Sequence, residues 1–256
     1  GSLALVGCGQ DEKDPNHIKV GVIVGAEQQV AEVAQKVAKE KYGLDVELVT
    51  FNDYVLPNEA LSKGDIDVNA FQHKPYLDQQ IKDRGYKLVA VGNTFVYPIA
   101  GYSKKIKSLD ELQPGSQIAV PNDPTNLGRS LLLLQQVGLI KLKDGVGLLP
   151  TSLDIVENPK NLKIVELEAP QLPRSLDDAQ IALAVINTTY ASQIGLTPAK
   201  DGIFVEGKES PYVNLIVARE DNKDAENVKK FVQAYQSDEV YEAANKIFNG
   251  GAVKGW

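Results

Sequence analysis

From residue 18 onward, the hydrophobic positions switch repeatedly between short continuous runs and a helical spacing. Residues 18–25 are a mostly apolar run closed by a glycine, which is typical of a buried strand. Within residues 27–41, apolar side chains recur at intervals of three and four, so one face of a helix is apolar. Gly43 ends this helix, and the apolar run at 46–51 predicts the next strand. A chain that alternates in this way is expected to form parallel βαβ units with right-handed crossovers.

The same alternation extends to the C-terminus. Further helices are predicted at 57–63, 108–115 and 125–137, and two more with apolar faces at 228–235 and 240–248. Further strands are predicted at 66–70, 117–120, 162–167 and 181–186. The sequence therefore predicts an α/β protein.

Two stretches interrupt the alternation. Residues 88–103 and 202–219 have an extended character and are longer than a typical single strand. We expect each of them to cross between two α/β lobes, which leaves a cleft between the lobes. The expected first lobe comprises 17–98 and 204–256, and the expected second lobe comprises 99–203.

The N-terminal segment carries the single cysteine of the chain, Cys8, after an apolar stretch that ends Leu5-Val6-Gly7. This pattern is typical of a bacterial lipobox, whose cysteine becomes the lipidated first residue of an exported protein; the alternative is a lone cysteine near a terminus. Because the chain opens on Gly1 instead of methionine, we interpret residues 1–7 as the remnant of a signal peptide and 9–16 as a tether. A lipid on Cys8 would anchor a domain that has no membrane-spanning segment.

Composition and motifs exclude several classes of function. The net charge of −7 argues against a nucleic-acid partner, since phosphate binding needs a basic surface. The chain has only two histidines and lacks the sequence motifs of zinc proteases, serine hydrolases and nucleotide-binding loops. We therefore expect no enzyme, no metal site and no cofactor. One cysteine also excludes an intrachain disulfide.

Polar and aromatic side chains follow the ends of the predicted strands instead. Ligands of open α/β sheets bind outside the carboxyl ends of the strands, so these residues are the candidates for a binding site. The candidates are Tyr54, Phe71, His73, Tyr76, Phe95, Tyr97, Asn126, Arg129, Asn187, Tyr212 and Asn214. An arginine in the first turn of a helix suits a carboxylate, amides suit an amino-acid headgroup, and rings suit an apolar side chain. Together they predict an amino-acid pocket.

Each candidate also has a purely structural interpretation. Asn126 or Thr125 could cap the helix that follows them, and Arg129 could pair with a surface carboxylate. Phe95 and Tyr97 could be core residues, and His73 could be a hydrogen-bonded structural residue.

Four segments around these candidates resemble one known family. The segments are residues 51–61 (FNDYVLPNEAL), 69–77 (NAFQHKPYL), 120–129 (VPNDPTNLGR) and 212–214 (YVN). They are similar to the methionine-binding lipoproteins of bacterial ABC importers, the MetQ/NlpA family, and the resemblance covers the chain from the lipobox to Trp256. It implies a type II periplasmic binding protein fold, L-methionine as the main ligand and D-methionine as a second one. It also implies permease and ATPase partners at the periplasmic face of a bacterial membrane.

The resemblance further implies roles for single residues. Arg129 would hold the ligand carboxylate with Asn126 nearby, while Asn187 and Asn214 would hold the amino or carboxylate group from the two sides of the cleft. The rings that would enclose the thioether side chain are Phe71, His73, Tyr76, Phe95 and Tyr97, with Tyr54 and Tyr212 as less certain members; sulfur–ring contacts favour methionine over a plain alkyl chain.

Three alternatives stay open at this point. The same fold could bind another small amino acid or a methionine-containing dipeptide, which the size of the pocket would distinguish. An enzyme would need a general base in the cleft, for which His73 is the one candidate near neutral pH. A surface adhesin without a ligand would not need the polar residues at the strand ends. We expect the free protein to be a monomer, and the sequence leaves open which bacterial membrane holds the lipid.

Overall fold

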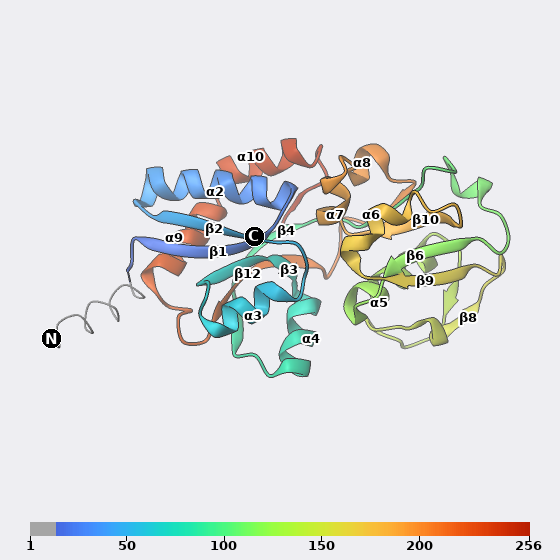
Figure 1. The fold of residues 1–256 in the computed structure, drawn as a ribbon, viewed down its shortest axis with the longest axis horizontal. Helices are drawn as coiled ribbons and strands as arrows, with labels where there is room; N and C mark the ends of the chain where they lie inside the picture. Colours follow the sequence, from blue (N-terminus) through green and yellow to red (C-terminus); the bar gives the residue numbers. More distant parts are fainter. Residues whose placement is uncertain (1–13) are drawn as a thin grey trace.

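The computed structural model describes residues 14–256. The expected lipobox and Cys8 lie outside this range. The described chain forms two α/β lobes side by side, each built on its own sheet (Figure 1). Within the described part, no helix combines the length and the apolar character needed to cross a bilayer.

The first lobe is built on a six-stranded sheet with the order β13-β4-β12-β3-β1-β2. These strands are β1 (His17–Ile23), β2 (Asp45–Phe51), β3 (Val68–His73), β4 (Leu88–Val96), β12 (Val213–Arg219) and β13 (Val253–Lys254). β1 pairs in parallel with β2 and β3, whereas β12 lies antiparallel between β3 and β4. The expectation of parallel units therefore holds for the first three strands, and the strand that returns from the second lobe makes the sheet mixed.

Helices cover both faces of this sheet (Figure 1). The helices α2 (Ala26–Tyr42), α9 (Glu226–Tyr235) and α10 (Asp238–Ile247) pack on one face, while α3 (Leu56–Lys63) and α4 (Lys74–Arg84) lie on the other. The predicted apolar stripe of α2 is buried, and Gly43 ends the helix in the left-handed conformation, with φ 61°. The two apolar layers hold the sheet rigid, so the strand ends have fixed positions.

The second lobe is built on a five-stranded sheet with the order β11-β5-β10-β6-β9. These strands are β5 (Ala100–Tyr102), β6 (Gln117–Pro121), β9 (Lys163–Leu167), β10 (Ile181–Ile186) and β11 (Phe204–Val205). Its helices are α5 (Pro124–Gln136), α6 (Leu172–Ser175), α7 (Thr188–Gln193) and α8 (Pro198–Asp201), and a small hairpin joins β7 (Lys141–Leu142) to β8 (Ile155–Glu157).

Two chain crossings connect the lobes, as the sequence predicted. The first runs from β4 to β5 through residues 97–99, and the second runs from β11 to β12 through residues 206–212. The strand β11 pairs with β5, so Phe204 and Val205 belong to the second sheet and not to the first lobe in which we expected them.

The remaining differences from the predicted elements are local. The third strand is Val68–His73 instead of 66–70, and the helix α4 that follows it was not predicted. The N-cap of α4 is unusual, because it is His73, whose ring accepts a hydrogen bond from the backbone N–H of Tyr76; Pro75 in the first turn and Gly85 at the end were the available signals.

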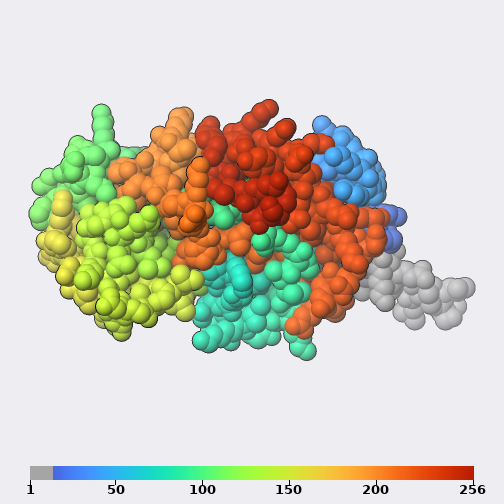
Figure 2. Space-filling view, turned by 180° about the vertical axis from the view of Figure 1, so that it is seen from behind, coloured from blue at the N-terminus to red at the C-terminus, as the bar shows by residue number. Residues whose placement is uncertain are grey.

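Apolar side chains from both lobes meet in one cluster between the sheets. Ile23, Phe71 and Tyr76 of the first lobe pack with Ile186 and Tyr190 of the second. Seen from behind, the green and yellow second lobe abuts the first lobe, and orange segments that precede the red C-terminal part of the chain lie at the junction (Figure 2). The two lobes are therefore in direct contact through this apolar cluster.

Candidate functional site

A cavity with about 360 Å³ of free space, counted with its mouth, lies between the two lobes. Its walls are formed by Glu27, Tyr54, Phe71, Gln72, His73, Tyr76, Tyr97, Asn126, Arg129, Asn187, Thr188, Thr189 and Asn214. The predicted site residues all belong to this wall except Phe95 and Tyr212. Whether the wall residues contact a ligand stays a prediction.

The topology explains why these residues meet. β1, β2 and β3 are parallel, so their carboxyl ends lie at one edge of the first sheet, and the chain leaves this edge at Glu27, Tyr54 and His73. Asn214 lies at the amino end of the antiparallel strand β12 and pairs with His73, which brings it to the same edge. In the second lobe, the parallel strands β6 and β10 deliver Asn126 and Asn187 to the opposite wall.

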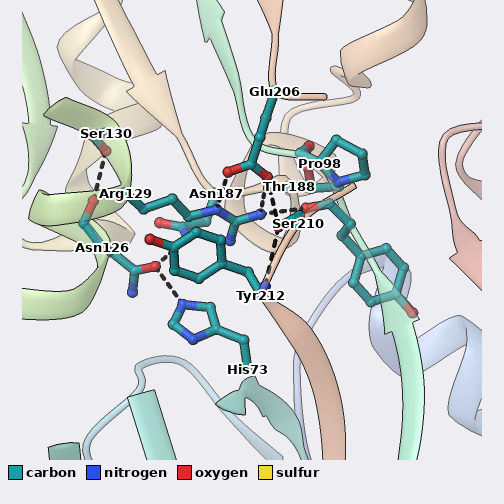
Figure 3. Close-up of polar contacts among 11 residues, drawn as sticks. His73, Pro98, Asn126, Arg129, Ser130, Asn187, Thr188, Glu206, Ser210 and Tyr212 are labelled. Carbon is teal, nitrogen blue, oxygen red and sulfur yellow. Dashed lines mark hydrogen bonds and ion pairs between the residues drawn. The ribbon is translucent and has the colours of Figure 1, made fainter. Parts of the chain in front are cut away.

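His73 is held at both ring nitrogens. Nδ1 accepts the hydrogen bond of the α4 cap at 3.1 Å, so Nε2 carries the proton and donates it to Oδ1 of Asn126 at 2.8 Å (Figure 3). Burial, together with the positive charge of Arg129, lowers the pKa of His73 to about 3. The ring is therefore neutral at physiological pH and joins the two lobes. A ring fixed in this way is not available as a general base.

Asn126 is the centre of a polar network in the second lobe. Its Oδ1 also accepts a hydrogen bond from Nδ2 of Asn187 at 3.2 Å, and its own Nδ2 donates to Asp123 at 2.8 Å. The helix α5 is capped by Asp123, which accepts from the backbone N–H of Asn126, and not by Asn126 or Thr125. Within residues 14–256, Oδ1 of Asn187 is buried without a hydrogen-bond partner. The free acceptor of this wall thus belongs to Asn187.

Arg129 is only 4% exposed and is paired with a carboxylate of the protein. Nε and Nη2 donate to the two oxygens of Glu206 at 3.0 and 2.7 Å, and Nη2 also donates to the carbonyl of Tyr97 at 3.0 Å (Figure 3). Glu206 and Tyr97 lie on the two crossings, so both connections between the lobes hold the guanidinium group. The interpretation of Arg129 as an ion-pair partner is therefore correct, although its carboxylate partner is largely buried.

An aromatic wall lies on the first-lobe side of the cavity. The ring of Tyr54 lies 5.9 Å from that of Phe71 and 5.8 Å from that of Tyr76, measured between centroids. The hydroxyl of Tyr76 donates to the carbonyl of Tyr54 at 2.8 Å, which fixes both rings. Rings at these spacings form an apolar surface with weakly polar edges, which suits a flexible thioether chain.

The structure places Phe95 outside the cavity, in contrast to the prediction. Phe95 lies within β4 on the face covered by α9 and α10, and its ring packs 5.0 Å from that of Trp256 and 6.3 Å from that of Tyr235. Tyr212 lies behind the cavity wall, where its ring contacts His73 at 5.0 Å and Cζ of Arg129 at 4.4 Å. Phe95 is thus a core residue, and Tyr212 supports two wall residues.

Glu27 is the main wall residue that the sequence did not reveal. It stands in the first turn of α2, is 3% exposed, and accepts a hydrogen bond from Nδ2 of Asn214 at 2.9 Å through Oε1. No residue of the described chain donates a hydrogen bond to Oε2. Burial raises the pKa of Glu27 to about 8, and the neighbouring polar side chains of Thr189 and Asn214 only partly oppose this shift.

Gln72, Thr188 and Thr189 were also missed. Thr188 and Thr189 directly follow the predicted Asn187, and Gln72 lies between two predicted residues. The rule that led to Asn187 would have found Glu27 as well, since Glu27 follows β1. Among residues 14–256, no three acidic, histidine or cysteine side chains are grouped in a way that could hold a metal ion.

The family model described as NlpA lipoprotein matches residues 18–256. The "D-methionine-binding lipoprotein MetQ" of Escherichia coli K12 is 96% identical over 256 residues, which is all of this chain and 94% of that protein.

Solved structures show the same similarity. A crystal structure described as the methionine binding protein MetQ has a TM-score of 0.94 and 95% identity, and the match covers 95% of this chain and 99% of that one. A nutrient binding protein from Burkholderia cenocepacia bound to methionine has a TM-score of 0.90 and 55% identity, with 93% of this chain and all of that chain covered.

Proposed function

The chain belongs to the NlpA lipoprotein family, and from this premise we propose that it binds L-methionine and D-methionine and delivers them to the permease and ATPase of an ABC importer. The observation that carries the proposal is the near-identity to a methionine-binding relative together with a cavity lined by amino-acid chemistry. The protein acts as a receptor and not as an enzyme.

We assign the apolar part of the ligand to one side of the cavity and its charged headgroup to the other. Tyr54, Phe71 and Tyr76 enclose the thioether chain of the ligand, and His73 and Tyr97 complete this apolar side. On the polar side, Asn187 and Asn214 bind the charged headgroup. Arg129 supplies positive potential for the ligand carboxylate, but two of its nitrogens are already bound to Glu206, so the carboxylate can reach only Nη1.

Binding requires the two lobes to separate and close. The crossings at 97–99 and 206–212 are the hinge, and we assign 17–98 and 206–256 to the first lobe and 99–205 to the second. His73 and Asn126 approach each other only when the lobes are closed. The small volume of the cavity favours a single amino acid over a dipeptide, because a dipeptide would need more space.

The protein works at the periplasmic face of a bacterial membrane as a lipid-anchored monomer. Cys8 is the lipid attachment site, and residues 9–16 are the tether. The anchor keeps the receptor near the membrane and so raises its effective concentration at the transporter.

Asn214→Ala tests the assignment of the polar wall. We expect methionine affinity, measured by calorimetry, to fall by tens of fold or more, because a polar group of the ligand loses its partner in a buried site. Asn93→Ala is the matched control, since Asn93 lies in the neighbouring strand β4 and its side-chain amide donates to the carbonyl of Gly255, outside the cavity. Unchanged affinity in Asn214→Ala would contradict the assignment.

A further inference from the structure

The wall of the cavity contains one buried carboxyl oxygen with no partner among the residues of the described chain, Oε2 of Glu27. Glu27 is only 3% exposed, and it lines the cavity. Buried carboxylates without a cation or several donors are strongly unfavourable, so such a group either binds a cation or takes up a proton.

Residues 14–256 place no free cation beside this carboxyl group. The one basic side chain in the cavity wall is Arg129, and its charge is already compensated by Glu206. The polar side chains that act on Glu27 are those of Thr189 and Asn214, and both are neutral. The titratable groups that interact with it are tyrosines: Tyr54 after β2, Tyr97 on the first crossing, Tyr190 of α7 and Tyr235 of α9. Burial raises the pKa of all four hydroxyl groups above the ordinary value, so they stay neutral at physiological pH.

We propose that Glu27 is the subsite for the ammonium group of the ligand, and that the carboxyl group releases its proton when that ammonium group enters the cavity. The inference rests on the proposed function. In the empty closed cavity the carboxyl group is neutral, which removes the cost of a buried charge. In the complex the ammonium group provides the missing donors for Oε2, and the position of Glu27 in the first turn of α2 further favours the ionised form.

The pKa of about 8 in the empty cavity fits this exchange. At pH 6 to 7 the carboxyl group is then mostly protonated before binding, whereas an adjacent ammonium group lowers its pKa and makes it ionise. Proton release coupled to binding requires the affinity to rise with pH in this range, by about tenfold per pH unit while one proton is displaced. The affinity stops rising once Glu27 is ionised in the free protein as well.

Calorimetric titration of the intact chain with L-methionine tests the proposal. The titration is run at pH 6.5 in phosphate and in imidazole, two buffers with different ionisation enthalpies, and the difference in observed heat gives the number of protons. We expect the release of about one proton per methionine in the wild type. We expect no release and an affinity independent of pH between 5.5 and 7.5 in Glu27→Gln.

Two other titratable groups near the cavity, His73 and Asp123, could release a proton on binding and therefore need a control. The pKa of His73 is about 3, so its ring does not titrate between pH 5.5 and 7.5. Burial raises the pKa of Asp123, which caps α5 beside the cavity, and Asp123→Asn should therefore keep the proton release of the wild type. Proton release that persists in Glu27→Gln, or disappears in Asp123→Asn alone, would overturn the proposal.

If Glu27→Gln fails to fold, the titration of the wild type alone still tests the proton release. Methionine binding with the same heat in both buffers would overturn the proton exchange and leave the proposed function intact, whereas no methionine binding would refute the proposed function itself. Thermal unfolding of the empty protein gives a second readout. Since the pKa of Glu27 is raised on folding, the wild type loses stability as pH rises toward 8, and the advantage of Glu27→Gln in melting temperature should grow over the same range.

Discussion

The first lobe contains two buried polar clusters, and they differ in completeness. Asn58, Asn69 and Gln72 bind one another through hydrogen bonds of 2.8 to 3.0 Å, and Asn69 also donates to the carbonyl of Pro57. The cluster of Glu27 and Asn214 has one hydrogen bond, of 2.9 Å, and leaves Oε2 of Glu27 without a partner in the described chain. Glu27 is as deeply buried as the members of the first cluster, whereas Asn214 is partly buried, so the burial of Glu27 does not explain why its cluster is incomplete.

The difference in hydrogen bonding between the two clusters indicates which of them binds a ligand. A complete cluster needs nothing from outside and contributes to the stability of the fold. An incomplete cluster costs stability in the empty protein, because an unsatisfied buried group keeps its full desolvation penalty. This cost is recovered when a ligand supplies the missing partner. Disrupting the first cluster should therefore change stability more than binding, and disrupting the second should change binding more than stability.

The largest effect on stability is expected from Asn58→Leu. The substitution removes the donor to Oε1 of Gln72 and the acceptor shared by Asn69 and Gln72. We expect the free energy of unfolding, measured with urea on the empty protein, to fall by about 3 kcal/mol.

Asn93→Leu is the control for this variant, because the amide of Asn93 makes one exposed hydrogen bond. Methionine affinity in Asn58→Leu should change far less than in Asn214→Ala. A variant that kept its stability but lost its affinity would reverse the comparison between the clusters.

A smaller loss is expected from Glu206→Gln, which tests whether the second lobe also has a complete polar network. The substitution keeps the shape of the side chain but leaves Arg129 buried without a counter-charge. We expect the free energy of unfolding to fall by about 2 kcal/mol, the range for losing a hydrogen bond to a charged group. We also expect methionine affinity not to fall, since the guanidinium group is then left with the ligand carboxylate as its only anion.

Asp177→Asn is the matched control for Glu206→Gln. It breaks the ion pair between Lys104 and Asp177, whose side chains are 55% and 70% exposed, and a pair as exposed as this contributes little to stability. A tenfold loss of methionine affinity in Glu206→Gln would show that Arg129 must be held by Glu206 before it can serve the ligand.

The strand-end rule predicted much of the cavity from the sequence. It found His73, Asn126 and Asn187, because a residue that follows a buried parallel strand is placed by the topology of the sheet. Asn214 was predicted from the second crossing, and it reaches the same edge because β12 is antiparallel to β3. The rule also points to Glu27, which follows β1, but we did not select this residue because the first turn of an amphipathic helix is usually solvated. The sequence does not show that the second lobe covers this turn. The two lobes and the two crossings were predicted for a related reason, since continuous apolar runs indicate buried strands.

Long-range pairing explains what the sequence could not show. Glu206 lies 77 residues from Arg129, on a segment without periodicity, so nothing in the sequence identifies it as the partner. Phe95 was misplaced because the side of a strand that an aromatic ring occupies depends on the helices that arrive later, here α9 and α10. The antiparallel strand β12 reflects the return of the chain from the second lobe, which local patterns do not encode.

The smallest expected effect concerns the seam between the lobes. Gln193 of α7 donates from Nε2 to the carbonyl of Val24 at 2.7 Å, and the backbone N–H of Ala26 donates to Oγ of Ser192 at 3.3 Å. Both bonds join the second lobe to the segment that directly precedes Glu27, so we expect them to break when the lobes open. We expect Gln193→Ala to weaken methionine binding about threefold, which corresponds to the loss of one exposed hydrogen bond.

The rate constants of methionine binding distinguish the hydrogen bonds between the lobes from the two clusters. Release of the ligand requires the lobes to open, so the loss of a bond across the seam should raise the dissociation rate and leave the association rate nearly unchanged. Gln113→Ala removes a comparable exposed bond, to the carbonyl of Glu111, within the second lobe alone, and should change neither rate. If Gln193→Ala instead slowed association, the bond would act before closure, and the incomplete Glu27 cluster would have to attract the ligand in the open state.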